Sequence, residues 1–387
     1  MTRPVTSPPT VPAPAAQDPV RGGRAAWIML ASGWSANQFS ALLGAYRDHL
    51  GLTESTVTGL FAVYVVGLIP ALLVAGPMAD RRGRRVVALT ALALNVLSTV
   101  LLMAGAWNPW LLLPGRFLTG VSAGALLAAG SAWIKELSGS PRRSGLFVSA
   151  GFATGGLGAA LIAEWAPWPM VTAYVPHVVL GVVAGALAVR EPETFRGRRS
   201  AASSGAAHPS RAFRREVLYV APWVFAAPTI GFVTLPGSVH AGLVLTGVAT
   251  AVVPGVGLLT ARRVCGSARP GLVAVAVGVV LAAGAAGTGS VLVALPAAAV
   301  LGGGYGLLLT YGLTRTVRLA PPERLAGWTS RFWTAAYVGM FMPYVVSLTS
   351  RWVSVPVILL AVAATALLTT TLPTPRSPAP APAAQPD

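Results

Sequence analysis

Long apolar runs alternate along this chain with short polar or charged stretches. A helix needs roughly 20 apolar residues to cross a hydrocarbon core, and a backbone in lipid must satisfy its hydrogen bonds internally. The runs therefore predict an all-α membrane protein with twelve transmembrane helices: Ala25–Tyr46, Val57–Ala75, Val86–Ala106, Trp110–Ile134, Leu146–Ala163, Met170–Val189, Val217–Leu235, Val239–Leu259, Gly271–Gly287, Val291–Leu313, Gly327–Leu348 and Val353–Leu372.

Polar segments divide these spans into two sets of six. Residues 190–215 carry seven arginines with Ser and Gly, and form the internal segment long enough to link two domains. We predict a cytoplasmic linker there, between six-helix bundles at residues 25–189 and 216–372. Residues 1–24 and 373–387 are rich in Pro and Ala and are predicted to be disordered cytoplasmic tails.

An internal repeat supports the six-plus-six division. A shift of 181 positions carries Gly76, Arg81 and Arg82 onto Gly257, Arg262 and Arg263. The same shift carries Pro141 and Arg143 onto Pro322 and Arg324, which follow the fourth and tenth spans. Chance alignment of arginine-rich loops is the alternative. Two bundles in the same orientation fit an axis along the membrane normal.

Charge placement predicts the topology of the chain. The net charge is +17, but only 10% of residues are charged and 54% are hydrophobic, with a mean hydropathy of +0.68. Under the predicted topology, 25 of the 28 basic residues lie in cytoplasmic loops or tails, while Arg47 and Arg351 lie outside and Arg116 lies in the membrane. Such asymmetry sets orientation during insertion. The basicity thus predicts a cell-membrane protein with both termini cytoplasmic, and no nucleic-acid partner.

Cofactor and enzyme chemistry find little support in the residue types. Cys265 is the single cysteine, and the four histidines are scattered without ligand spacing. No Ser/His/Asp grouping or phosphate-binding loop stands out in the sequence. We therefore expect no cofactor, no metal and no enzymatic activity.

The turn between the second and third spans is the most distinctive stretch. It reads Gly76-Pro-Met-Ala-Asp80-Arg81-Arg82-Gly83-Arg84-Arg85. This spacing of glycines, acid and bases resembles the signature loop of the major facilitator superfamily, with Met78 where Leu or Ile is usual. An ordinary basic loop would explain the arginines but not the acid and the glycines. The resemblance covers roughly Ala25 to Leu372.

The resemblance implies a monomeric secondary transporter that works by alternating access. It favours export of a small hydrophobic or amphiphilic compound coupled to protons. Uptake of a metabolite, or a receptor or scaffold without transport, are the alternatives. It also implies that Asp80 latches the cytoplasmic junction, meeting the N-terminus of the eleventh span near Gly327. The alternative role for Asp80 is to offset repulsion among its neighbouring arginines.

Arg116 lies about 9 Å into the fourth span, six residues after Trp110 at 1.5 Å per residue. Gly120 and Gly124 share its helix face and would allow another helix to approach closely. The pattern resembles the fourth-helix motif of the superfamily, whose arginine is implicated in proton coupling. The alternative is an arginine that snorkels to the outer headgroups.

Carboxylates near the membrane core are scarce. Asp48 and Glu164, at the outer ends of the first and fifth spans, are the candidate proton carriers, and Asp48 is the better partner for Arg116 because both lie towards the outer face. Solvated helix-end carboxylates are the alternative.

Cavity and packing candidates come from polar, aromatic and glycine positions. Asn37 and Gln38 lie midway along the first span and either line a cavity or bond between helices. The aromatic candidates are Trp223, Phe225, Tyr305, Tyr311, Trp333 and Tyr337. In span five, Gly151 and Gly155 loosely resemble the glycine motif of drug antiporters, but Gly156 replaces its usual proline. Close packing of span five against span eight would explain these glycines equally well.

Overall fold

The computed structural model describes residues 19–140, 142–194, 211–263, 266–321 and 325–371. These residues form helices joined by short connections, with no strand among them. The predicted tails lie largely outside the described residues, as do residues 195–210 of the predicted linker.

The N-terminal half contains the first six helical units. Its elements are α1 (Pro19–Ala41), α2 (Leu43–Leu50), α3 (Glu54–Arg82), α4 (Arg84–Ala104), the turn η1 (Pro109–Leu111), α5 (Leu112–Ala125), the π-helical turn η2 (Leu126–Gly130), α6 (Ser131–Ser138), α7 (Arg142–Trp165), α8 (Pro169–Thr172) and α9 (Val175–Ala188).

The C-terminal half contains the other six units. Its elements are α10 (Arg211–Phe213), the π-helical turn η3 (Arg214–Leu218), α11 (Ala221–Thr229), the π-helical turn η4 (Ile230–Thr234), α12 (Leu235–Ser238), α13 (Leu243–Thr260), α14 (Arg269–Thr288), α15 (Val291–Leu319), α16 (Leu325–Val338), the turn η6 (Gly339–Phe341), α17 (Met342–Thr349) and α18 (Val355–Thr371).

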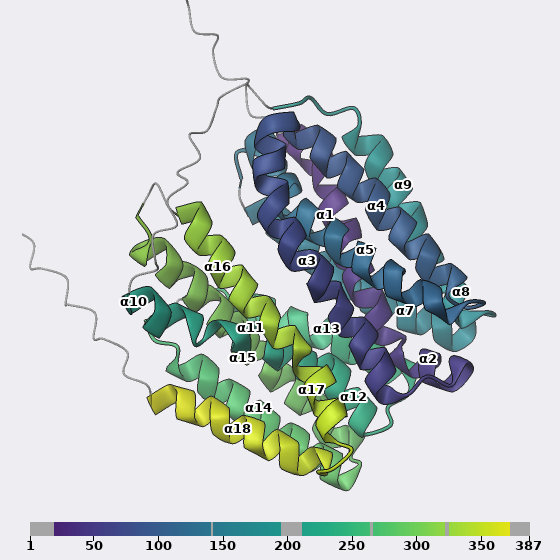
Figure 1. Cartoon of the computed structure of the whole chain (residues 1–387), viewed down its shortest axis with the longest axis vertical. Helices are drawn as coiled ribbons and strands as arrows, with labels where there is room; N and C mark the ends of the chain where they lie inside the picture. The colour runs from purple at the N-terminus through teal and green to yellow at the C-terminus, as the bar shows by residue number, and fades with distance from the viewer. Residues whose placement is uncertain (1–18, 141, 195–210, 264–265, 322–324, 372–387) are drawn as a thin grey trace, which may run out of the picture.

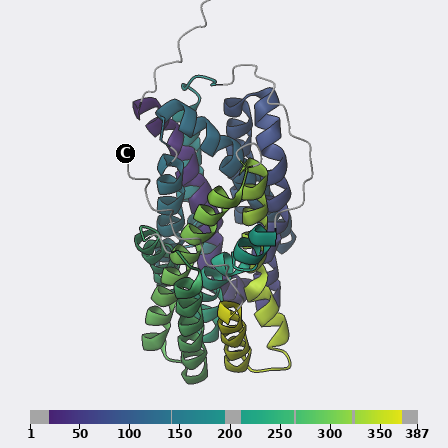
Figure 2. The ribbon, with the colours of Figure 1, turned by 90° about the vertical axis from the view of Figure 1, so that its left-hand side faces the viewer.

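The predicted all-α membrane fold is confirmed. Ten helical segments of the described chain are long and apolar enough to cross a membrane, and α18 is a shorter apolar helix. The unit formed by α1 and α2 completes the twelve. The helices of the two halves lie side by side and run in broadly similar directions (Figures 1 and 2).

Several helices extend beyond the predicted apolar runs. α1 begins at Pro19 rather than at residue 25, and the seventh unit begins at Arg211 inside the predicted linker. The physical reason is that hydropathy marks only the part of a helix that lies in lipid. A helix can continue into water with arginines on its surface.

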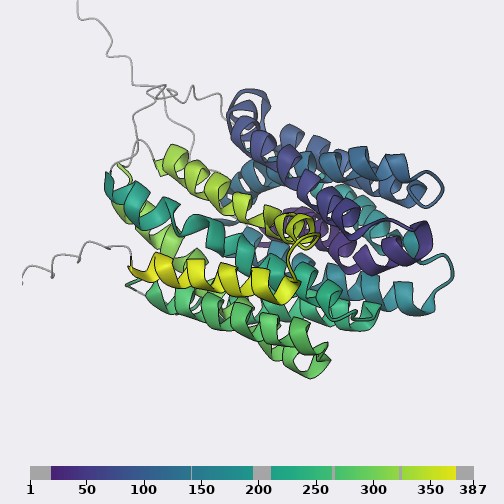
Figure 3. The ribbon, with the colours of Figure 1, turned by 60° about the horizontal axis from the view of Figure 1, so that its bottom comes forward.

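The two halves repeat the same set of helix pairs. In the N-terminal half α3 packs on α5, α4 on both α5 and α9, and α1 on α7. In the C-terminal half α13 packs on α15, α14 on both α15 and α18, and α11 on α16. These pairs correspond unit by unit, as the 181-residue repeat predicts. Figure 3 shows the halves as two layers of helices.

The ends of the helices define two faces of the molecule. The signature-loop face carries residues 76–85 and the start of α16, and the opposite face carries α2, α8 and the start of α15. Thr58 and Ser347 join the halves by a hydrogen bond of 2.7 Å, and Arg351 donates to Ser55 at 3.0 Å. Both contacts lie toward the opposite face, so the halves are held together there.

Candidate functional site

A small central cavity of about 50 Å³ lies where the two halves meet. α1, α3 and α7 line it from one half, and α11, η4, α13, α15, α16 and η6 line it from the other. Its walls are largely aromatic and carry no charged side chain: Ala36, Asn37, Phe61, Tyr64, Phe152, Phe225, Pro228, Thr229, Phe232, Pro254, Tyr305, Tyr337 and Met340.

Phe225 is at the centre of the aromatic wall in the C-terminal half. Its ring stacks on Tyr337 with centroids 4.6 Å apart, and it lies 6.0 Å from Tyr305 and 6.2 Å from Trp333. Phe61 meets Phe232 edge-on across the halves at 6.4 Å. Aromatic pairs at such distances contribute about 0.5–1.5 kcal/mol beyond area burial. They offer flat apolar surfaces to a ligand.

The structure brings together three of the four predicted cavity residues: Asn37, Tyr305 and Tyr337. The Asn37 amide also donates to the carbonyl of Phe152 at 2.9 Å and to that of Thr250 at 3.5 Å. Asn37 therefore both lines the cavity and forms hydrogen bonds between helices, the two roles that the sequence left open.

Gln38 does not line the cavity. Its side chain donates to the Thr99 hydroxyl on α4 at 3.3 Å, inside the N-terminal half. Successive helix residues point about 100° apart at 3.6 residues per turn. Gln38 therefore cannot share the direction of Asn37.

The N-terminal half contributes aromatic cavity residues that the sequence reasoning missed. Phe61 and Tyr64 are three positions apart on α3, so they share a helix face. That spacing was the available signal. Three of the predicted aromatic candidates, Trp223, Tyr311 and Trp333, are not among the lining residues.

Arg116 is fully buried in the N-terminal half, which excludes the snorkelling alternative in this conformation. Its guanidinium lies 4.3 Å from the Phe39 ring and 5.0 Å from the Tyr64 ring. It donates to the carbonyls of Leu60 and Phe61 at 3.4 and 3.5 Å, and Nη1 has no hydrogen-bond partner. Aromatic faces attract a cation and partly replace its hydration. Arg116 is thus placed beside Tyr64, a wall of the central cavity.

The expected pairing of Asp48 with Arg116 does not occur in the structure. Asp48 and Glu164 are exposed at helix ends, whereas Arg116 is enclosed. Neither carboxylate has the burial that a conformation-sensitive proton carrier requires. Sequence depth placed these groups on one side of the membrane, but it did not show which way they point.

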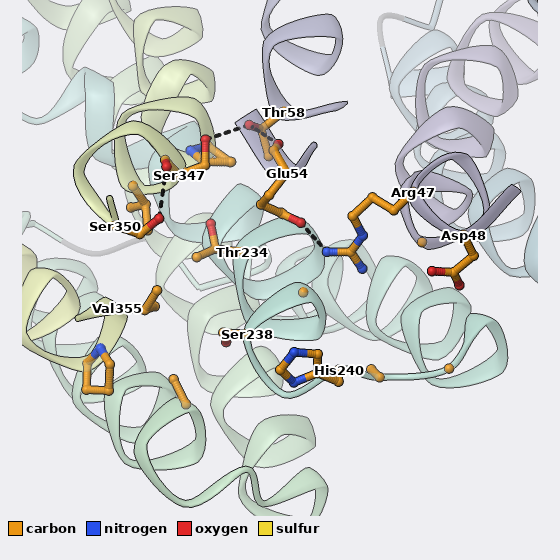
Figure 4. Close-up of a pocket in the computed structure, with 18 of the residues that line it drawn as sticks. Arg47, Asp48, Glu54, Thr58, Thr234, Ser238, His240, Ser347, Ser350 and Val355 are labelled. Carbon is orange, nitrogen blue, oxygen red and sulfur yellow. Dashed lines mark hydrogen bonds and ion pairs between the residues drawn. The ribbon is translucent and has the colours of Figure 1, made fainter. Parts of the chain in front are cut away.

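A larger polar vestibule of about 730 Å³ opens on the opposite face (Figure 4). It lies between the halves, with Arg47, Asp48 and Glu54 on one side and His240 and Ser347 on the other. Arg47 and Glu54 form an ion pair across the α2–α3 turn. The inter-half contact of Ser347 with Thr58 lines this vestibule, so the vestibule ends at the closed junction.

Carboxylates from elsewhere in the N-terminal half bind the signature loop. Glu193 accepts hydrogen bonds from the backbone amides of Arg84 and Arg85, each at 3.0 Å, and so caps the first turn of α4. A carboxylate at this position satisfies amides that the helix leaves free. Arg84 also pairs with Glu136 at 2.5 Å.

Gly83 supplies the turn between α3 and α4. Its φ of 101° is strained for residues with a side chain, and a Cβ there would lie 2.5 Å from the Glu193 carboxylate. Arg81 and Arg82 are exposed, and nothing lies within 4 Å of a Cβ at Gly76.

The contact found for Asp80 lies within its own loop. Asp80 pairs with Arg84 at 3.4 Å, and its side chain is 46% exposed. This arrangement matches the alternative in which Asp80 offsets arginine repulsion. This pairing does not join the two halves. The predicted contact of Asp80 with the N-terminus of α16 remains a prediction for a second conformation.

The predicted packing glycines do allow helices to touch. A Cβ at Gly120 or Gly124 would lie 1.9 or 2.4 Å from carbonyl oxygens of α3. One at Gly151 or Gly155 would clash with the backbone of α1, rather than with α13 as expected. Gly156 is the glycine that contacts α13, because a Cβ added there would lie 2.2 Å from the Thr250 hydroxyl oxygen.

A buried hydrogen-bond network inside the N-terminal half was not predicted. His177 lies between the Thr99 hydroxyl at 2.8 Å and the Asn95 side-chain oxygen at 3.0 Å. The Asn95 amide donates in turn to Ser35 and Ser122. Both imidazole nitrogens are occupied, so the network fixes four helices to one another. Among the described residues, no group of three or more His, Cys, Asp or Glu side chains is placed to hold a metal.

Fold and site define a multi-pass α-helical membrane protein, built from two similar halves around a central aromatic cavity. A family model described as the Major Facilitator Superfamily matches residues 25–342, and the chain belongs to that family.

Solved structures of transporters show the same fold at low sequence identity. A POT family transporter in complex with 5-aminolevulinic acid has a TM-score of 0.73 at 12% identity, covering 91% of this chain and 95% of that one. A mutant form of the nucleoside transporter NupG has 0.69 at 9% identity, covering 91% and 99%. The D-xylose-proton symporter has 0.62 at 16%, covering 90% and 96%.

Similarity to a curated relative is confined to one stretch. The Multidrug resistance protein MdtL of Shigella flexneri serotype 5b (strain 8401) is 36% identical over 95 residues, and that of Escherichia coli (strain K12 / DH10B) is 35% identical over 95 residues. Each match spans 24% of this chain and 24% of the relative.

Proposed function

We propose that this protein is a proton-coupled exporter of small hydrophobic or amphiphilic compounds that works by alternating access. The observation that carries the proposal is the uncharged aromatic cavity shared by both halves. Small-molecule sites bind through apolar burial, with a few polar groups that fix orientation, and this cavity, at about 50 Å³, would have to widen to admit such a compound. Here those groups are the Asn37 amide and the phenols of Tyr64, Tyr305 and Tyr337.

The local similarity to a multidrug resistance protein supports this choice of substrate class. We also propose that the transporting unit is a monomer. We further propose that the signature-loop face is cytoplasmic, as the arginine distribution favours. The structure then represents an inward-facing conformation, because the hydrogen bonds of Thr58 and Arg351 join the halves toward the other face.

Proteoliposomes test the proposal. Vesicles containing the full-length protein and loaded with ethidium or rhodamine 6G would be placed in acidic buffer to impose a proton gradient. Dye release is expected to accelerate with the gradient. Acceleration only when the gradient is reversed would indicate uptake, and no protein-dependent dye movement in either direction would contradict the transport proposal.

A matched pair of variants tests the cavity itself. Phe225→Ala removes the central ring of the aromatic wall and is expected to reduce dye transport strongly. Phe117→Ala removes a ring that is 42% exposed on α5 and is expected to leave transport near the parental rate. Equal losses in the two variants would argue against the cavity as the substrate site.

Cysteine labelling tests the orientation. In a background with Cys265→Ser, a cysteine at Trp168 or His240 is expected to react with an impermeant reagent added outside intact cells. Both residues lie on the opposite face, at turns with positive φ. Labelling of a cysteine at Arg196 or Arg324, which lie outside the described residues, would instead indicate the opposite orientation in the membrane.

A further inference from the structure

A buried ion pair in the C-terminal half belongs to none of the sites described above. Glu216 lies in the π-helical turn η3, and Arg315 lies near the end of α15. Their side chains are 4% and 15% exposed. Arg315 donates from Nε to Glu216 Oε2 at 2.6 Å, and its Nη2 contacts the same oxygen. The sequence reasoning missed Glu216 because it follows directly on the arginine-rich linker.

The surroundings of the pair contain phenols and arginines. On α15, Tyr311 lies one helical turn before Arg315, and Tyr219 follows η3, three residues after Glu216. α14 contributes Arg269 near Tyr219, and Arg331 is the charged residue on α16. Phe213 of α10 packs on Trp328 of α16 with ring centroids 4.6 Å apart. Glu216 is therefore the carboxylate of this cluster.

A buried carboxylate beside an arginine responds to conformation. Burial disfavours its charged form, and the arginine favours it. When the two side chains separate, the carboxylate takes up a proton. When they meet again, it releases the proton. Such a group couples proton binding to movement of the helices that hold the pair.

The seventh unit is constructed so that it can move in this way. Two π-helical turns, η3 and η4, interrupt it, and Pro222 and Pro228 lie between them. Wide turns and prolines remove regular helix hydrogen bonds and permit bending. Glu216 is located in the first of these turns.

The same two helical units contribute residues to the central cavity. Phe225 follows Glu216 on the seventh unit, and Tyr305 precedes Arg315 by ten residues on α15, about 15 Å along the helix. Movement of α11 against α15 would therefore change both the ion pair and the distance between the two cavity rings. The pair lies toward the signature-loop face, where α15 ends and α16 begins (Figure 1).

We propose that Glu216 is the proton-binding site that couples protons to the conformational change, with Arg315 as its counter-ion. This inference rests on the proposed function and names its coupling residue. A proton from water binds the Glu216 carboxylate, and the ion pair breaks. Arg315 keeps its charge. Release of the proton restores the pair.

A measurement without substrate tests the site directly. Spin labels at Trp165→Cys and Leu292→Cys report the opening of the opposite face, since these residues are exposed there, one on each half. Double electron–electron resonance on the full-length protein in nanodiscs, with Cys265→Ser, gives the ratio of conformers between pH 5 and pH 8.5. A one-unit difference in proton affinity between conformers changes that ratio by about tenfold.

Glu216→Gln is expected to abolish this pH dependence and to hold the ratio at its parental pH 5 value. The matched control is Glu191→Gln, a second buried carboxylate, 2% exposed and 3.8 Å from Arg24, but in the other half. In the control variant, the ratio of conformers should change with pH as it does in the parent. If Glu216→Gln is unstable, Glu216→Gln with Arg315→Gln removes both charges and should also be insensitive to pH. An unchanged titration in either Glu216 variant would overturn the proposal.

Proteoliposomes separate this inference from the proposed function. Glu216→Gln should lose the acceleration of ethidium efflux by a proton gradient while retaining exchange of ethidium across the membrane. Gradient-driven efflux that survives in this variant would refute Glu216 as the coupling site and leave the exporter intact. A parent whose conformer ratio depends on pH through Glu216 but which moves no dye would contradict the proposed function and leave the proton-binding site intact.

Discussion

The seam between α7 and α13 offers a sharp test of how the halves move. Gly156 on α7 faces Thr250 on α13, where an added Cβ would lie 2.2 Å from the hydroxyl oxygen and 2.6 Å from the Thr250 Cβ. The Thr250 hydroxyl already donates to the Gly247 carbonyl at 2.7 Å, so turning it away would lose that bond. The Gly156→Ala variant must therefore push the helices apart.

The size of the effect follows from these distances. Carbon atoms in contact prefer about 3.5–4.0 Å, so the seam would have to widen by about 1 Å. Overpacking of this kind costs about 1–3 kcal/mol. If the seam loosens when the opposite face opens, most of that cost falls on the conformation described above. The conformer ratio would then shift about 5–150-fold toward the open form.

The assay is the spin-label distance between positions 165 and 292, measured at one pH. Gly156→Ala is expected to lengthen it in a larger fraction of molecules. Gly145→Ala is the control on the same helix, where nothing lies within 4 Å of the added Cβ. Both changes gain about 1 kcal/mol of helix propensity, which cancels in the comparison. Identical distance distributions for the two variants would refute the steric reasoning.

Three further predictions concern charged groups of the N-terminal half. Arg116→Met should keep the apparent melting temperature yet abolish dye transport. Arg116→Ala should abolish transport and also lower the free energy of unfolding by about 2–4 kcal/mol, because it leaves a void. Dye transport at the parental rate by the Met variant would remove Arg116 from the coupling mechanism. Asp80→Asn should remove only the exposed ion pair with Arg84, which contributes about 0–1 kcal/mol to stability. A change of more than tenfold in the ratio of conformers would point instead to a latch on α16. Glu193→Gln should weaken the cap of α4 by about 0.5–2 kcal/mol, and unchanged hydrogen exchange at the first amides of that helix would contradict the assigned contact.

The sequence by itself determined the membrane fold, because lipid leaves the backbone few alternatives to a helix. Runs of about 20 apolar residues therefore located the spans, and the 181-residue repeat predicted the matching helix pairs of the two halves. Periodicity also identified Gly120 and Gly124 as packing positions. Hydropathy could not define where helices end in water, so the starts of α1 and the seventh unit were misplaced.

Only the tertiary structure decided which side chains meet. Depth along a helix suggested Asp48 for Arg116, but rotation about the helix axes leaves the first exposed and the second buried among rings. Asn37 and Gln38 are neighbours in sequence and belong to different sites for the same reason. The pair of Glu216 with Arg315 joins residues 99 positions apart, through a π-helical turn that no local pattern revealed. Such contacts depend on how whole helices pack, which a one-dimensional pattern of polarity does not encode.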